Sequence, residues 1–173
     1  MDLKTVLLEL NAMEADGIVE RYAIGGAVGA TFYLEPVATL DVDVFISFQA
    51  RPGSLLISPQ PVFKYLTERG ARVEGEYLII ADWPVRFLPP TGPLVEEALA
   101  EAVQVEVEEI RTRVFTAEHL AAIALRTRRP KNKARLLQFL ESGVLSAERL
   151  QNIIERHALS GVWRKFEQQF LQS

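Results

Sequence analysis

Residues 22–45, which read YAIGGAVGATFYLEPVATLDVDVF, contain the patterns that decide the fold. A strand is predicted over 21–24, followed directly by Gly25-Gly26 and by a helix of small apolar residues over 27–34. The strand predicted over 40–48 alternates strictly, so each of its faces carries one kind of side chain. The apolar face holds Leu40, Val42, Val44 and Ile46, and the other face holds Asp41, Asp43, Phe45 and Ser47. The order strand, glycine pair, helix and strand predicts a sheet with two acids on one face.

Asp41 and Asp43 are the first candidate functional residues. Two carboxylates two positions apart on a strand project from the same face and can converge on one divalent cation. Gly25 and Gly26 let the backbone approach a ligand closely, and the helix N-terminus that follows presents free N–H groups to phosphate. The same acids are also compatible with a solvated strand face that binds nothing, and the Asp-Val-Asp pattern alone favours that interpretation.

Several other classes of site are excluded by residue types and spacing. Position 24 is isoleucine where the dinucleotide-binding G-x-G-x-x-G motif needs glycine, and no P-loop lysine follows the glycines. The absence of cysteine excludes disulfide scaffolds, thiolate metal sites and cysteine nucleophiles. The two histidines lie far apart in the sequence and give little basis for a zinc enzyme.

Length and composition predict a globular protein of one domain with a small appendage. The chain has 173 residues, of which 49% are hydrophobic and 24% charged, and a formal net charge of -4. That charge excludes a generally basic nucleic-acid binder but not a local basic patch. No basic-then-apolar leader opens the chain, and the longest charge-free apolar stretch, 22–34, is shorter than the about 20 residues that span a bilayer. We therefore expect a cytoplasmic protein without a membrane segment.

The rest of the chain divides into an α+β part, 1–115, and a helical part, 116–173. Further helices are predicted over 2–15, from Ser58-Pro59 onward and over 94–102, and further strands over 71–74, 77–81, 85–88, 103–107 and 110–115. From Thr116 only helical patterns follow, with Thr116 and Ser146 as expected N-caps. The expected fold class is α+β, with a mixed sheet flanked by helices and then a C-terminal helical bundle.

These motifs together carry a resemblance to a known superfamily. Ile24-Gly25-Gly26, followed by Thr39-x-Asp41-x-Asp43, resembles the signature of the DNA polymerase β-type nucleotidyltransferases. More narrowly, the chain resembles small bacterial nucleotidyltransferase-fold proteins related to the AbiE-type abortive-infection toxins. Support continues through the segments at 84–89 (PVRFLP), 118–120 (EHL) and 129–131 (RPK). The likeness touches most of the chain, although only the glycine pair and the Asp pair are chemically specific.

The resemblance implies a nucleotide-binding site and a reaction. Asp41 and Asp43 would hold Mg²⁺ and act in catalysis, and Gly25, Gly26 and Thr39 would contact a nucleoside triphosphate. An acceptor hydroxyl would attack the α-phosphorus and displace pyrophosphate. The acceptor is not identified by the sequence, and an RNA end, a protein hydroxyl, a small molecule and another nucleotide all stay open.

Two departures from the superfamily pattern bear on activity. Active relatives carry a third carboxylate on a later strand, and the matching position here is Arg86, a cation that repels Mg²⁺ but can contact phosphate directly. The basic run at 126–135 contains Lys131 and Arg135, which we assign to phosphate contact, although a solvated helical corner is an equal alternative. Asn132 stands where relatives place an aspartate next to the lysine.

Three functions therefore remain open at this point. In the first, the chain is a nucleotidyltransferase that uses Mg²⁺ at Asp41 and Asp43. In the second, it is a catalytically silent binding or regulatory module of the same fold, such as one half of a toxin–antitoxin-like pair. In the third, it is an interaction protein whose two aspartates lie on the surface and bind nothing. Arg86 favours the second function and the two retained aspartates favour the first. The sequence does not decide whether the protein is an enzyme, which base it selects or its oligomeric state.

Overall fold

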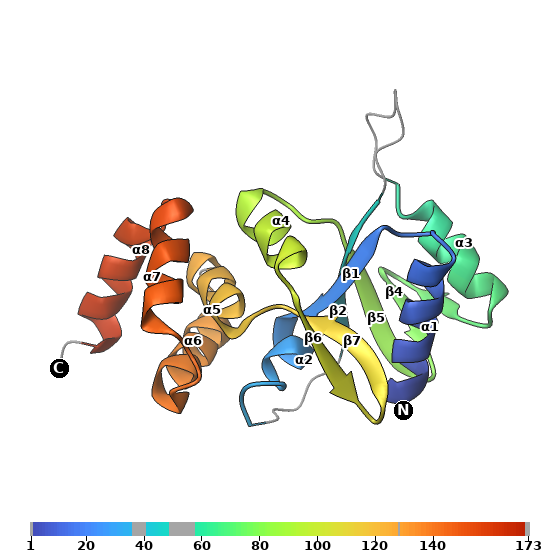
Figure 1. Ribbon diagram of the computed structural model, residues 1–173, viewed down its shortest axis with the longest axis horizontal. Coiled ribbons are helices and arrows are strands. Elements are labelled where there is room, and N and C mark those ends of the chain that lie inside the picture. The colour runs from blue at the N-terminus through green and yellow to red at the C-terminus, as the bar shows by residue number, and fades with distance from the viewer. Residues whose placement is uncertain (1, 36–40, 49–57, 128, 172–173) are drawn as a thin grey trace.

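The computed structural model describes residues 2–35, 41–48, 58–127 and 129–171, and its centre is a mixed sheet (Figure 1). Seven strands are paired in the order β3-β4-β5-β2-β1-β7-β6. Their bounds are β1 Arg21–Gly25, β2 Val42–Ser47, β3 Arg72–Glu74, β4 Tyr77–Ile80, β5 Trp83–Leu88, β6 Val103–Val107 and β7 Ile110–Val114. Strand β2 runs antiparallel to β1 and parallel to β5, and β1 is parallel to β7. The expected α+β class with a mixed sheet is confirmed.

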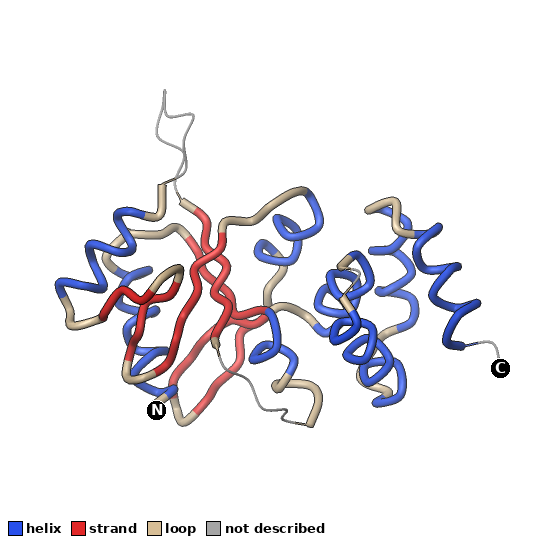
Figure 2. Tube along the Cα trace, turned by 180° about the vertical axis from the view of Figure 1, so that it is seen from behind, coloured by secondary structure: helices blue, strands red, loops and turns tan. Residues whose placement is uncertain are grey.

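The described residues form eight α-helices, arranged on both sides of the sheet (Figure 2). Their bounds are α1 Leu3–Ala15, α2 Gly26–Ala30, α3 Gln60–Glu68, α4 Pro93–Ala100, α5 Ala117–Arg126, α6 Pro130–Ser142, α7 Ala147–Arg156 and α8 Ser160–Phe166. Helices α1 and α3 share one hydrophobic cluster with Val42, Val44 and Ile46 of β2. Alternation along the strand sends Asp43 and Phe45 to the opposite face, the face against which the C-terminal helices pack.

The segment after the glycine pair differs from its prediction. A helix was expected over 27–34, but α2 ends at Ala30 after five residues and the chain continues as turns. Thr31 turns its hydroxyl back onto the carbonyl of Val28, and Tyr33 donates its hydroxyl hydrogen to the carbonyl of Phe115. The Thr31 contact is local, whereas the Tyr33 contact holds the chain against the residue that follows β7, so the chain continues as turns and the helix is not extended.

Two of the C-terminal helices begin at the N-caps that the sequence predicts. Thr116 and Ser146 are the N-caps of α5 and α7, and each accepts a hydrogen bond from a backbone N–H three residues later. Gly143 ends α6 in the left-handed conformation, with φ of +75°. Helix α8 passes into a π-turn at Glu167–Leu171, so Phe166 is buried while Phe170 is 42% exposed.

One hydrophobic cluster joins the C-terminal helices to the sheet. It contains Ala23 of β1, Leu94 and Leu99 of α4, and Phe139 and Ile154 of α6 and α7. The division at residue 116 therefore stays a prediction, since buried apolar contacts cross it. Among the described residues, no helix has the length and apolar character that crossing a membrane requires.

Candidate functional site

Asp43 lies at the centre of the candidate site because two neighbouring strands place other functional residues beside it. In the β1–β2 register Asp43 pairs with Gly25, and in the β2–β5 register it pairs with Arg86. The Arg86 Nε donates a hydrogen bond to Oδ1 of Asp43 at 3.0 Å. The Asp43 side chain is 17% exposed and that of Arg86 is 32% exposed, so this ion pair is partly withdrawn from water.

The glycine pair is required by contacts that leave no room for a side chain. A Cβ at Gly26 would lie 2.5 Å from Oδ2 of Asp43, and Gly26 also has a φ of +60°. A Cβ at Gly25 would lie 2.7 Å from the ring of Phe45, which packs against Phe115 with ring centroids 4.8 Å apart. The glycines therefore let β1 and α2 lie directly against the acid-bearing face of β2. Their assignment to nucleotide binding stays a prediction.

Arg86 is influenced by both aspartates of the motif. The hydrogen bond to Asp43 raises the pKa of Arg86, and the charges of Asp43 and Asp41 raise it further against the opposing effect of burial. Asp41 immediately precedes β2, and its carboxylate, together with burial, raises the pKa of Tyr77 on β4. A second, weaker ion pair joins Nη1 of Arg86 to the exposed Glu76 at 3.7 Å. Arg86 thus contacts one of the acids that the sequence assigns to a metal and is influenced by the charge of the other.

Arg135 reaches the same site from helix α6. Burial lowers the pKa of Arg135, and the nearby charge of Asp43 partly restores it. Lys131, one turn earlier on α6, is exposed to solvent. The charge of Asp43 therefore acts on Arg135, while Lys131 lies in solvent, and no hydrogen bond or ion pair among the described residues joins Arg135 to Asp43. Thr39, the remaining residue assigned to nucleotide binding, lies outside the described residues.

The site holds no close substitute for the missing third carboxylate. Asp82 is exposed in the turn before β5, with a φ of +67°, and so does not lie on the strand face that Arg86 occupies. Glu35 is exposed after α2. Among the described residues, the position next to Asp43 on β5 is therefore filled by a guanidinium and by no acid.

A second polar cluster, which the sequence reasoning missed, surrounds Glu97 of α4. His119 Nε2 and His157 Nε2 lie 2.8 and 3.1 Å from Oε2 of Glu97, and Arg156 donates to Oε1. Burial would raise the pKa of Glu97, but the hydrogen bonds from Arg156 and the two histidines lower it to about 2. The cluster joins α4 to α5 and α7. The two histidines, remote in sequence, gave no signal that they share one partner.

The Glu97 cluster also contains atoms that could ligate a metal ion. Single ligand atoms of Glu97, Glu101 and His119 lie within 4.8 Å of one another. Hydrogen bonds from Arg156 and both histidines already satisfy the Glu97 carboxylate, and Nδ1 of His119 lies 2.7 Å from the Thr116 hydroxyl. We assign this cluster a structural role.

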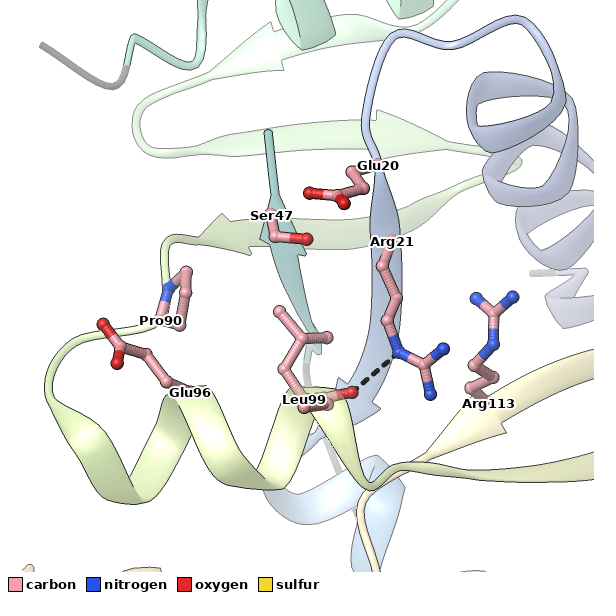
Figure 3. A pocket seen from close by; sticks show the side chains of 8 residues that line it. Glu20, Arg21, Ser47, Pro90, Glu96, Leu99 and Arg113 are labelled. Carbon is pink, nitrogen blue, oxygen red and sulfur yellow. Dashed lines mark hydrogen bonds between the residues drawn. The ribbon is translucent and has the colours of Figure 1, made fainter. Parts of the chain in front are cut away.

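A cavity of about 460 Å³ opens at the other end of β1 and β2 (Figure 3). It is lined in part by Arg21 and Ser47, which are paired at the opposite end of the register from Gly25 and Asp43. Arg21 also holds the C-terminal end of α4, because it donates to the carbonyls of Leu99, as Figure 3 shows, and of Ala102. This cavity and the Asp43 site are therefore separate places on the sheet.

Comparison with solved structures identifies similar folds. An antigenic nucleotidyltransferase-like protein from Paracoccidioides brasiliensis matches 94% of this chain and 92% of its own with a TM-score of 0.60 and 15% identity. The antibiotic-resistance factor ANT(2'')-Ia matches over 98% of both chains with a TM-score of 0.54 and 18% identity. A crystal structure of ANT(2'')-Ia in complex with adenylyl-2''-tobramycin matches 88% of this chain and 95% of that one, with a TM-score of 0.52 and 17% identity.

Sequence comparisons give no such match. No family model matches the chain, and no curated protein sequence matches it significantly. At 15–18% identity, the structural likeness shows the fold and not the activity. The chain therefore has a nucleotidyltransferase-like fold, with Asp43, Arg86 and the glycine pair meeting at one end of the β1–β2 pair.

Proposed function

We propose that this protein binds a nucleoside triphosphate at the site formed by Gly26, Asp43, Arg86 and Arg135. The observation that carries the proposal is the ion pair between Asp43 of β2 and Arg86 of β5, which lies beside a glycine whose Cα faces Asp43. A guanidinium presents a planar fork of N–H donors, the geometry that phosphate oxygens accept. Support also comes from the fold, which this chain shares with ANT(2'')-Ia, solved in complex with adenylyl-2''-tobramycin.

Within this proposal, a binding or regulatory module is favoured over an active transferase. Transfer by the superfamily mechanism needs Asp41 and Asp43 to be free for Mg²⁺, and Oδ1 of Asp43 accepts a hydrogen bond from Arg86 instead. The retained pair Asp41 and Asp43 is the observation that favours a transferase, which we keep as the second candidate. Its acceptor, whether RNA, protein or a small molecule, stays a prediction, as does the toxin–antitoxin-like pairing.

Thermal melting with each of ATP, GTP, CTP and UTP tests the proposal. A ligand at about 100 times its dissociation constant stabilises the folded protein by about 2.7 kcal/mol. For a chain of this size, that raises the melting temperature by roughly 5–10 °C. At least one nucleotide is expected to give such a shift, in buffer with chelator or with MgCl₂. Asp43→Ala should remove the shift, whereas Glu20→Ala, in the cavity at the other end of the sheet, should keep it. The absence of any shift with all four nucleotides contradicts the proposal.

The transferase candidate has its own test. Radiolabelled α-phosphate should be incorporated into an added acceptor, or pyrophosphate released, only if Asp41 and Asp43 support chemistry. Binding without either product, across RNA, protein and aminoglycoside acceptors, supports the binding module. Product formation that Asp41→Asn abolishes supports the transferase.

A further inference from the structure

We infer that the Asp43 site recognises nucleotide phosphates without a divalent cation, with Arg86 and Arg135 supplying the positive charge. This inference rests on the proposed function and deepens it, because it states which groups neutralise the triphosphate. It departs from what the resemblance implies, namely Mg²⁺ held by Asp41 and Asp43.

The first step is the arrangement of donors around Asp43. A carboxylate that binds a metal needs at least one oxygen directed at the ion. Oδ1 of Asp43 accepts the Nε–H of Arg86 at 3.0 Å, and Oδ2 lies 2.5 Å from the position that a Cβ on Gly26 would occupy. The oxygen that pairs with Arg86 therefore faces a cation, and the other faces the side of Gly26 that carries no side chain. The residues present do not fit a divalent cation as the superfamily pattern places it.

The second step is the balance of charge. A divalent cation is favourable where carboxylates leave an excess of negative charge. Here Asp41 and Asp43 carry two negative charges, and Arg86 and Arg135 carry two positive charges that Asp43 influences directly. The register holds Arg86 next to Asp43, so Mg²⁺ at Asp43 would lie beside a fixed guanidinium. The two guanidinium groups thus offset the two carboxylates, so no excess of negative charge is left at this site to attract a metal.

The third step concerns what Arg86 still offers. Only its Nε is used by Asp43, while Nη1 has a distant, exposed partner in Glu76 at 3.7 Å. No other described residue accepts from the remaining N–H groups of the guanidinium, which can therefore donate to a phosphate at the partly exposed side of the pair. Asp43 acts here as a positioning residue, since it fixes the plane of Arg86. Arg135 brings a second guanidinium, half-buried and therefore weakly hydrated, from α6.

Isothermal titration calorimetry with the four nucleoside triphosphates, in EDTA and in excess MgCl₂, tests the inference on the wild-type protein. We expect binding in EDTA that is as tight as in MgCl₂ or tighter, because Mg²⁺ masks the phosphate charge that the arginines recognise. Binding that requires MgCl₂ overturns the inference and leaves the proposed function intact. No binding in either buffer overturns both, so the two failures are distinguishable.

Variants then assign the effect to Arg86. Arg86→Gln should weaken binding in EDTA at least about tenfold, the size of one lost charge-assisted contact. Arg72→Gln removes an exposed arginine on β3 and is the matched control, with affinity expected to stay unchanged. Equal losses in both variants would show a general charge effect and overturn the assignment. Circular dichroism and melting temperature verify that each variant is folded.

Metal binding without nucleotide gives an independent readout. Mn²⁺, detected by the loss of its free electron-paramagnetic-resonance signal, serves as the probe. The wild-type protein should take up no Mn²⁺ at this site, while Arg86→Asp, which places a third carboxylate beside Asp43, should acquire one ion. Stoichiometric uptake by the wild-type protein that Asp43→Asn abolishes overturns the inference.

Discussion

Arg86 and Asp43 occupy paired positions of the parallel strands β5 and β2, with the guanidinium Nε 3.0 Å from the carboxylate Oδ1. The sequence places these residues 43 positions apart, and only the strand register brings them into contact. Both side chains are partly buried, so water is partly excluded from their charged groups and each depends on the other for a hydrogen-bonding partner. This pair links the stability of the sheet to the electrostatics of the candidate site.

Removing both partners should therefore cost less than the sum of the costs of removing each one alone. We expect Asp43→Ala to lower the free energy of unfolding by about 1–3 kcal/mol, because a partly buried guanidinium loses a charge-assisted hydrogen bond. A double-mutant cycle with Arg86→Ala should give a coupling energy of about 1–2 kcal/mol, measured by urea denaturation. The exposed pair Arg72 and Glu74, 3.5 Å apart, is the control, with an expected coupling of about 0–1 kcal/mol. Equal couplings in the two cycles would show that Arg86 and Asp43 form an ordinary surface pair.

Gly26 should be far less tolerant of a side chain than another glycine with a similar backbone conformation. Gly17 and Gly26 have φ values of +73° and +60°, but only Gly26 has a close neighbour, Oδ2 of Asp43. Gly17→Ala should cost about 1 kcal/mol from backbone strain alone. Gly26→Ala should cost at least about 1–2 kcal/mol more, because Asp43 must also move.

A second substitution identifies the source of that extra cost. In the Asp43→Ala background, Gly26→Ala should approach the cost of Gly17→Ala, since the clashing oxygen is absent. Chemical denaturation of the four variants measures these differences. If Gly26→Ala costs the same with and without Asp43, the close approach is not the reason for glycine at this position.

The two basic residues of α6 that the sequence assigns to phosphate should differ in effect. Arg135 lies close enough to Asp43 for the two charges to interact, whereas Lys131 is exposed. We expect Arg135→Gln to weaken nucleotide binding about tenfold, and Lys131→Gln to change it less than about threefold because an exposed ammonium stays largely hydrated. Fluorescence titration with a labelled nucleotide measures both affinities. The reverse order would move the phosphates toward the N-terminus of α6.

Local patterns predicted much of the fold, because they depend on residues close together in the chain. The alternation in β2 and the capping residues Thr116 and Ser146 encode their structure within a few positions. The shortened α2 was not predicted, because Tyr33 is held by the distant carbonyl of Phe115. The sequence located Asp43 and identified Arg86 as a departure from the superfamily pattern. That the two form an ion pair depends on the β2–β5 register, which joins residues far apart in the chain and could not be predicted from either segment.

Glu97 should make the stability of the protein depend on pH in the acid range. Its pKa is about 2 in the folded protein, against 4.5 for an unperturbed glutamate, because Arg156, His119 and His157 hydrogen-bond its ionised form despite its burial. A folded pKa below the unfolded value gives stability that is fully present above about pH 4.5 and is lost as the pH falls toward 2. A shift of this size corresponds to about 3 kcal/mol at most.

Denaturation at a series of pH values measures this contribution. Glu97→Gln should be less stable than the wild-type protein by about 2–3 kcal/mol at neutral pH, and the difference should shrink steadily between pH 4.5 and 2 as the wild-type carboxylate is protonated. Glu96→Gln, on the exposed side of the same helix, is the control and should follow the wild-type profile. A constant difference between Glu97→Gln and the wild type across this range would show that the carboxylate charge does not hold α4 to α5 and α7. In that case the lower stability of Glu97→Gln would come from the geometry of the amide, whose oxygen can still accept from Arg156, and not from the loss of charge.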